Sequence, residues 1–262
     1  MSKQYGKLSF ENLEDIHKLL KDLRDISPFF RNMTHENAGK IVEEFDIQLN
    51  WSFFYTLPFP DHLSLLIKSL NLNDDLSYAA KQSNPQSCLL SLWRDKKIKD
   101  WDGGYEGRFS QGGAIALAIS FIRSFESILV FNKPLNRLVS DLREGDKSAL
   151  RKILQIDHSA VSVPEIARGL MYAELEHRVS FFNQIGNAIK EKDTTKDKKD
   201  LEHGELRFFL ALLQESDELK RLSEEQCYQL FCLQLKLFPD GGTDPAGSLN
   251  RFIRRWKKNT RT

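Results

Sequence analysis

The sequence has few cysteines and no long hydrophobic run. Three cysteines occur among the 262 residues, and no two of them stand in a C-x-x-C arrangement. This excludes an encoded zinc ribbon or disulfide framework and suggests three small buried apolar residues in a reducing compartment. The most apolar stretch, residues 114–122, is followed at once by Arg123 and Glu126. Because it falls short of the roughly 20 residues that cross a bilayer, we expect a buried helix and no membrane span.

An excess of charge of one sign is also missing. The chain has 38 Lys and Arg residues against 37 Asp and Glu residues, which gives a formal net charge of +1. No overall field therefore attracts nucleic acid or an anionic membrane, and any such binding must come from a local patch. Residues 1–20 lack the uncharged apolar core of a signal peptide, so we expect a cytoplasmic protein.

Familiar catalytic motifs are absent as well. The sequence contains no H-E-x-x-H, G-x-S-x-G or G-x-G-x-x-G motif and no calcium-binding EF-hand loop. We therefore expect no cofactor, and we favour a non-catalytic interaction or regulatory protein over an enzyme. Its expected partner is another protein, with nucleic acid as the alternative.

Apolar residues recur at helical spacing along nearly the whole chain. Near the N-terminus, for example, Leu13, Ile16, Leu20 and Leu23 fall on one stripe. This pattern predicts an all-α fold, an irregular multi-helix array or bundle. Residues 46–59 are dense in aromatic side chains. For this segment, a minor β segment and an irregular aromatic segment are alternative predictions.

Turn and capping residues predict several helix ends. Prolines at 134 and 164 favour helix starts, Gly145 favours a helix end, Asp146 can cap the following helix, and Ser223 is a typical N-cap. The segment after Pro164 can form one kinked helix or two. Its first residues, PEIARGL, resemble the first helix of a helix-turn-helix motif, but we expect residues 171–178 to continue as helix, which disfavours that motif.

Composition divides the chain into five regions. These are an N-terminal helical region (1–102), a glycine-rich loop (103–113), a central helical region (114–190), a charged linker (191–200) and a C-terminal helical region (201–262). The alternative is a single domain that contains all five regions.

The last predicted helix is basic. Its apolar residues Leu249, Phe252, Ile253 and Trp256 share one face. Six cations cover the remainder, namely Arg251, Arg254, Arg255, Lys257, Lys258 and Arg261. They can bind the phosphates of a nucleic acid or an acidic partner. Alternatively, the helix simply packs by its apolar face, and its dipole favours cations near the C-terminus.

Two further groups of residues suggest binding sites. Gly112 and Gly113 precede the apolar helix, and with Arg108 they could hold an anion at a helix N-terminus. The sequence is not a Walker motif, and a flexible connector is the alternative.

Two E-x-x-H pairs, Glu14 with His17 and Glu174 with His177, have the spacing of ligands in helical di-iron proteins. Solvated surface charges are the alternative there.

Four Phe-Phe doublets occur, at residues 29–30, 53–54, 181–182 and 208–209. Adjacent residues on a helix cannot place both rings on one narrow stripe. We therefore expect some of these rings to lie between two packed elements or to be exposed for a partner.

Overall fold

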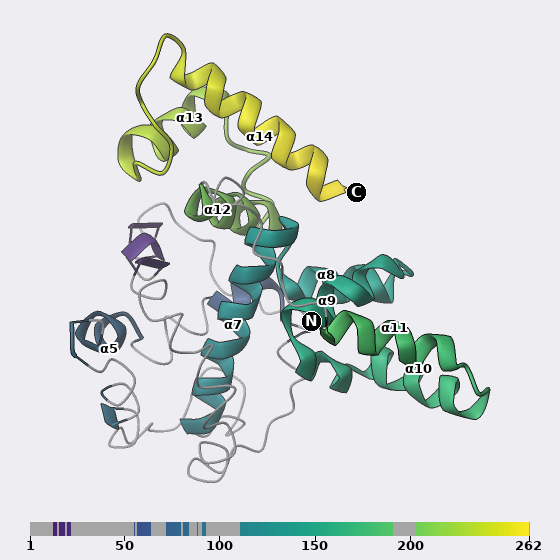
Figure 1. The fold of residues 1–262 in the computed structure, drawn as a ribbon. Coiled ribbons are helices and arrows are strands. Elements are labelled where there is room, and N and C mark those ends of the chain that lie inside the picture. The colour runs from purple at the N-terminus through teal and green to yellow at the C-terminus, as the bar shows by residue number, and fades with distance from the viewer. Residues whose placement is uncertain are drawn as a thin grey trace. The chain divides into compact units, whose positions relative to one another are not determined.

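The structure of the chain is a computed structural model. It describes residues 13–14, 16–18, 20–21, 55, 57–63, 72–79, 81–83, 88, 91–92, 111–190 and 203–261. These residues are mainly helical and include no strand, which confirms the predicted all-α fold (Figure 1). None of the described helices is both long and apolar enough to cross a membrane.

The chain divides into two compact units. One contains Met1–Asn50 with Pro60–Ile122, and the other contains Trp51–Phe59 with Arg123–Thr262. Residues 103–110 of the predicted loop and the whole predicted linker 191–200 lie outside the described residues, so the five-region division stays a prediction.

In the first unit, the predicted apolar stripe near the N-terminus is buried. Leu13, Ile16 and Leu20 are each no more than 2% exposed, whereas Leu23 lies outside the described residues. The same unit contains α5 (Leu72–Ala79). Its buried His62 lies 3.0 Å from the Ser120 hydroxyl, measured from Nε2 to Oγ.

Helix α7 (Gln111–Phe131) belongs to both units, because the division falls between Ile122 and Arg123. It begins at Gln111, inside the predicted glycine-rich loop (103–113). The remaining elements belong to the second unit, and their bounds are α8 (Leu135–Arg143), α9 (Ser148–Ile156), η1 (His158–Ser162), α10 (Pro164–Leu175), α11 (Val179–Lys190), α12 (Gly204–Glu215), α13 (Glu224–Tyr228), η3 (Gln229–Gln234) and α14 (Pro245–Arg261).

Several of these helices end where capping chemistry predicts. Gly145 follows α8 with a φ of 103°, a left-handed conformation that glycine adopts without a steric cost. The Asp146 carboxylate then accepts a 2.9 Å hydrogen bond from the backbone N–H of Ser148, at the start of α9. At α13, Ser223 and Gln226 form a reciprocal capping box.

The segment after Pro164 forms two helices, and the expected helix through residues 171–178 is wrong. Helix α10 ends at Leu175, and α11 begins at Val179. The residue between them that reverses the chain is His177, with a φ of 53°. The N–H of Arg178 bonds to the carbonyl of Ala173 at 2.7 Å, and the N–H of His177 bonds to that of Glu174 at 3.2 Å. This is the Schellman pattern, with histidine where glycine is usual.

Helices α10 and α11 lie side by side and run in opposite directions (Figure 1). A Cβ atom added at Gly169 of α10 would lie 3.0 Å from the Phe181 ring of α11. Glycine accommodates this close approach, whereas a larger residue would require the Phe181 ring to shift by a few tenths of an ångström. The two helices form an antiparallel hairpin, which we call the α10–α11 hairpin.

The core of the second unit is built around α9. This helix buries Ala149, Ile153, Leu154 and Ile156, and it contacts α8, α11 and η1. The α10–α11 hairpin is joined to this core through Ile166, Ile185 and Ala188, among other residues.

A buried hydrogen bond connects residue 55 to this core. The Tyr55 hydroxyl donates to the Asp157 carboxylate at 2.6 Å, and the N–H of Ser159 donates to the same carboxylate at 2.9 Å. Burial, followed by the negative charge of Asp157, raises the pKa of the Tyr55 phenol far above its ordinary value. Tyr55 lies in a turn, and residues 59–63 are helical. The described part of the aromatic segment is therefore not a strand.

The free cysteines are only partly as expected. Cys227 and Cys232 are buried, whereas Cys88 is partly exposed. Burial raises the pKa of both buried thiols, which keeps them protonated and weakly reactive.

We predict that Ile153→Ala lowers the free energy of unfolding by about 2–5 kcal/mol, because it leaves a cavity in the core around α9. Leu175→Ala is the matched control, since Leu175 is 70% exposed, and we expect a change within about 0.5 kcal/mol there. Urea unfolding followed by far-ultraviolet circular dichroism measures both. Equal losses for the two variants would contradict the assignment of the core.

We also predict that Tyr55→Phe costs about 1–3 kcal/mol of unfolding free energy, because it leaves the buried Asp157 carboxylate without its phenol donor. Tyr172 is 51% exposed, so Tyr172→Phe serves as the control with the same chemical change. A thermal melt of the two variants beside the unchanged protein compares them, and similar melting temperatures for all three would disprove the contribution of this bond.

Candidate functional site

Helix α14 packs by its predicted apolar face. Leu249, Ile253 and Trp256 are at most 5% exposed, and α14 contacts α13. Phe252, on the edge of this stripe, is partly exposed. The apolar face is therefore used in the fold, and the polar side of the helix is left for other contacts.

The cations of α14 do not form one uniform row. Arg254 donates to the Glu224 carboxylate at 2.8 Å. Arg251 donates to the Ser248 hydroxyl at 2.9 Å and lies 3.8 Å from Asp244. Of the remaining cations, Arg255 and Lys258 are exposed and Lys257 is partly exposed. The structure does not describe the side chain of Arg261. A nucleic-acid interface along this helix stays a prediction.

The glycine pair lies inside α7 rather than before it. Gly112 and Gly113 belong to the first turn of this helix, whose N–H groups have no partners within the helix. Arg108 lies outside the described residues, so the anion hypothesis at this position stays a prediction.

The two E-x-x-H pairs differ in their local structure. Glu14 and His17 lie in a helical stretch of the first unit. Glu174 is in the last turn of α10, but His177 lies beyond the helix end, with a positive φ. Glu174 and His177 therefore do not share a helical face, contrary to the basis of the hypothesis. In the described part of the chain, no three His, Cys, Asp or Glu residues are grouped as a metal site requires.

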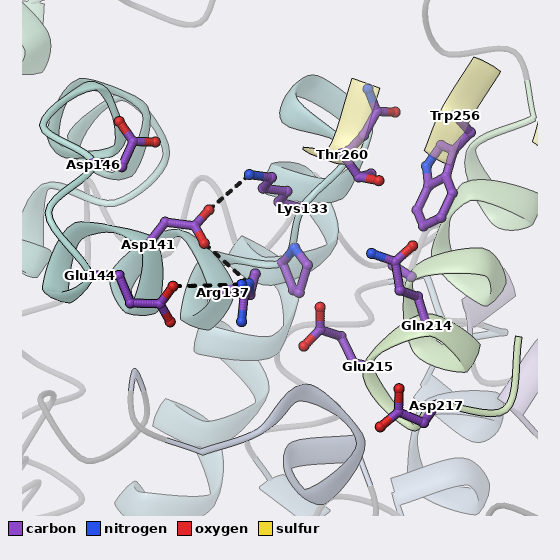
Figure 2. A pocket seen from close by; sticks show the side chains of 13 residues that line it. Lys133, Arg137, Asp141, Glu144, Asp146, Gln214, Glu215, Asp217, Trp256 and Thr260 are labelled. Atoms are coloured by element: carbon purple, nitrogen blue, oxygen red, sulfur yellow. Dashed lines mark hydrogen bonds and ion pairs between the residues drawn. The ribbon is translucent and has the colours of Figure 1, made fainter. Parts of the chain in front are cut away.

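A cavity of about 720 Å³ opens in the second unit. It is bordered by the α7–α8 connection and α8, by the end of α12, and by α14 (Figure 2). Its charged and polar lining residues include Lys133, Arg137, Asp141, Glu144, Asp146, Gln214, Glu215, Asp217 and Thr260. We call it the carboxylate cavity, because five carboxyl groups and two cations line it.

Asp141 is the paired carboxylate of this cavity. It accepts from Lys133 at 2.9 Å and from Arg137 at 3.1 Å (Figure 2). Glu215 has no ion pair among the described residues. Burial raises the pKa of the Glu215 carboxyl, Arg137 opposes this, and Asp141 and Asp217 raise the pKa further. Glu215 is therefore a carboxyl group that holds its proton to a higher pH than usual.

Trp256 lines the same cavity with an unsatisfied donor. The residue is 4% exposed, and its indole Nε1 has no hydrogen-bond partner among the described residues. In Figure 2 the indole stands beside Gln214 and near Thr260. The unsatisfied indole N–H can donate to an acceptor atom of a ligand, whereas the excess of carboxyl groups over cations in the lining favours a cationic ligand.

A second cavity, of about 480 Å³, has the opposite charge. His203, Arg207, Phe238, Ser248, Arg251, Phe252 and Arg255 line it, and we call it the arginine cavity. It uses two of the predicted basic residues of α14 and adds Arg207 from α12, which the sequence alone did not single out. Arg207 and Arg255 are 48 positions apart in the chain, and no local pattern signals that they come together.

Among the described residues, the two most exposed large apolar side chains lie beside the turn of the α10–α11 hairpin. Leu175 is 70% exposed and Val179 is 66% exposed. With Met171, Tyr172 and Phe182, all exposed, they form what we call the hairpin tip. The doublet Phe181-Phe182 was the sequence signal for this surface, since Phe181 packs on Gly169 while Phe182 is exposed.

Comparison with known proteins gives no family to which this chain can be assigned. No family model matches the sequence, and no curated protein and no solved structure matches the chain.

The raised pKa of Glu215 generates a pH prediction. The folded state binds the Glu215 proton more tightly than the unfolded chain does. The protonated carboxyl group therefore contributes stability at low pH, and this contribution is lost as the pH rises through the raised pKa. We expect Glu215→Gln to be more stable than wild type at pH 7, with a gain that shrinks as the pH is lowered below that pKa.

Urea unfolding midpoints across this pH range measure the effect. Glu174→Gln changes an exposed carboxylate and is the control, for which we expect no such gain. A Glu215→Gln variant less stable than wild type at pH 7 would contradict the assigned burial.

Proposed function

We propose that this protein is a non-catalytic helical interaction protein that binds a partner protein through the hairpin tip. The observation that carries the proposal is the exposure of five large apolar side chains within residues 171–182. Large apolar side chains that gather on the surface of a soluble protein often mark a site that another molecule covers.

The side chains at the hairpin tip are of the types that dominate protein interfaces. Tyr172 and Phe182 are aromatic, and Met171 is a flexible apolar residue that adapts to different partners. Positions 172 and 175 are three residues apart on α10, and positions 179 and 182 are three apart on α11. Residues at that spacing share a helix face, so each helix presents a pair of neighbouring apolar side chains.

The fold does not require these side chains for its own packing. The hairpin is joined to the core by other residues, among them Ile166 and Ile185, and its two helices meet where Phe181 packs on Gly169. The exposed residues are therefore available for a partner without any loss from the core.

The charges near the tip favour a protein over an anionic membrane. Glu174 and Glu176 are exposed, and the one arginine at the turn, Arg178, is paired with Glu176. Helices that bind anionic membranes surround their apolar residues with unpaired cations. The tip instead offers an apolar patch with acidic neighbours, which suits a partner whose own apolar patch is bordered by basic residues.

The test is comparative affinity capture with quantitative mass spectrometry, followed by a direct binding measurement on the purified partner. We expect the double variant Leu175→Ser with Val179→Ser to lose the partner and to weaken direct binding by about tenfold or more, because both side chains would be buried centrally in the interface. Circular dichroism should show an unchanged helical content.

Leu233→Ser is the matched control, since Leu233 is an exposed leucine of η3 outside the hairpin. We expect this control to retain the partner with affinity within about twofold of wild type. The proposal fails if the double variant captures the same proteins as wild type, or if the hairpin tip binds lipid vesicles but no protein.

A further inference from the structure

The arginine cavity carries a separate inference that does not rest on the hairpin tip. Three of its lining residues are arginines, from α12 and α14, and none is an Asp or a Glu. Guanidinium groups remain charged at any physiological pH, so the lining is strongly cationic although the whole chain is almost neutral. This concentration of positive charge is a product of the fold.

Two of the three guanidinium groups are held by neighbours of different kinds. Arg207 donates to the backbone carbonyl of Leu129 at 3.2 Å. Arg251 is positioned by its 2.9 Å bond to Ser248, with Asp244 at 3.8 Å. Arg255 is exposed and has no carboxylate partner in the described part of the chain. An anion bound between them would offset the repulsion of three like charges and accept hydrogen bonds from several donors.

An aromatic wall stands beside the arginines. The His203 ring lies 4.8 Å from the Phe238 ring and 5.4 Å from the Phe252 ring, measured between centroids. The Phe238 and Phe252 rings are 6.0 Å apart. All three rings line the cavity and are partly exposed. A planar base can stack on such rings while its phosphate reaches the guanidinium groups.

We propose that the arginine cavity binds a phosphate ester that carries an aromatic base, that is, one nucleotide unit. Cations and aromatic rings that line one cavity can recognise both halves of such a ligand, whereas a simple anion would use the arginines alone. The cavity volume, about 480 Å³, lies within the range of sites for small molecules. The nucleotide unit is either a free mononucleotide or one residue of a single-stranded nucleic acid.

Two sets of binding measurements on the full chain distinguish these sources. The first titrates adenosine 5′-monophosphate, adenosine and inorganic phosphate by isothermal calorimetry at low salt. The second titrates a fluorescently labelled single-stranded oligonucleotide by anisotropy at several salt concentrations. We expect the monophosphate to bind more tightly than adenosine or phosphate, because each of these has only half of the contacts. If the source is nucleic acid, the oligonucleotide binds more tightly still, and its affinity falls steeply with salt.

Arg255→Ala is the decisive variant, since Arg255 is exposed on α14 and its loss should leave the fold intact. We expect it to weaken binding of the preferred probe by about tenfold or more. Arg255→Lys should restore part of this loss, because lysine keeps the charge without the planar fork. Lys258→Ala removes an exposed cation of the same helix that does not line the cavity, and we expect it to change monophosphate binding by less than about twofold.

The proposal is overturned if neither probe binds at low salt, or if Arg255→Ala binds the probe as well as wild type does. It is also overturned if inorganic phosphate binds as tightly as the monophosphate, because the aromatic wall would then contribute nothing. Loss of oligonucleotide binding to the same extent in Arg255→Ala and Lys258→Ala would indicate a diffuse basic surface and would likewise exclude the cavity.

Discussion

The buried apolar face of α9 is the constraint on which the second unit depends. This helix of nine residues contacts α8, α11 and η1, and isolated helices of that length are not stable in water. Tertiary packing must therefore supply the stability that local hydrogen bonds cannot. The bond between Tyr55 and Asp157 reinforces this core, because it joins residues 102 positions apart in the chain.

The same core determines what the α10–α11 hairpin can offer to a partner. The core takes up residues such as Ile166 and Ile185 from the two helices. The remaining apolar residues, at the turn end, find no place in it and stay exposed. A hairpin held firmly at one end and apolar at the other is a suitable structure for presenting a binding surface, because its backbone is already ordered before the partner arrives. The exposed patch and the rigid support are thus two consequences of one packing arrangement.

Charge is distributed in this protein by the contacts between elements. The chain as a whole has a net charge of +1, yet one cavity of the second unit collects five carboxyl groups and another collects three arginines. Helix α14 contributes to both, since Trp256 lines the first and Arg255 lines the second. Neighbouring residues of one helix therefore border environments of opposite charge. Such separation gives each cavity a preference for one class of ligand that the composition of the chain does not suggest.

The sequence by itself determined the helical fold and many of its local details. The spacing of Leu249, Ile253 and Trp256 predicted the buried face of α14, and Gly145 and Ser223 predicted helix ends that the structure confirms. These features depend on residues within one or two turns of each other, so a local pattern is sufficient to predict them. The break at His177 was missed because histidine occupies a position where glycine is the usual signal.

Only the tertiary structure decided which side chains meet. Arg207 joins Arg255 in one cavity, Glu215 lies near Arg137 in another, and Leu175 is left outside the core although Ile153, an aliphatic side chain of similar size, is fully buried. Each outcome depends on the relative placement of helices distant in sequence, and periodicity carries no information about that placement. The physical reason is that a helical pattern specifies an apolar face, whereas the neighbouring helices decide how much of that face is covered.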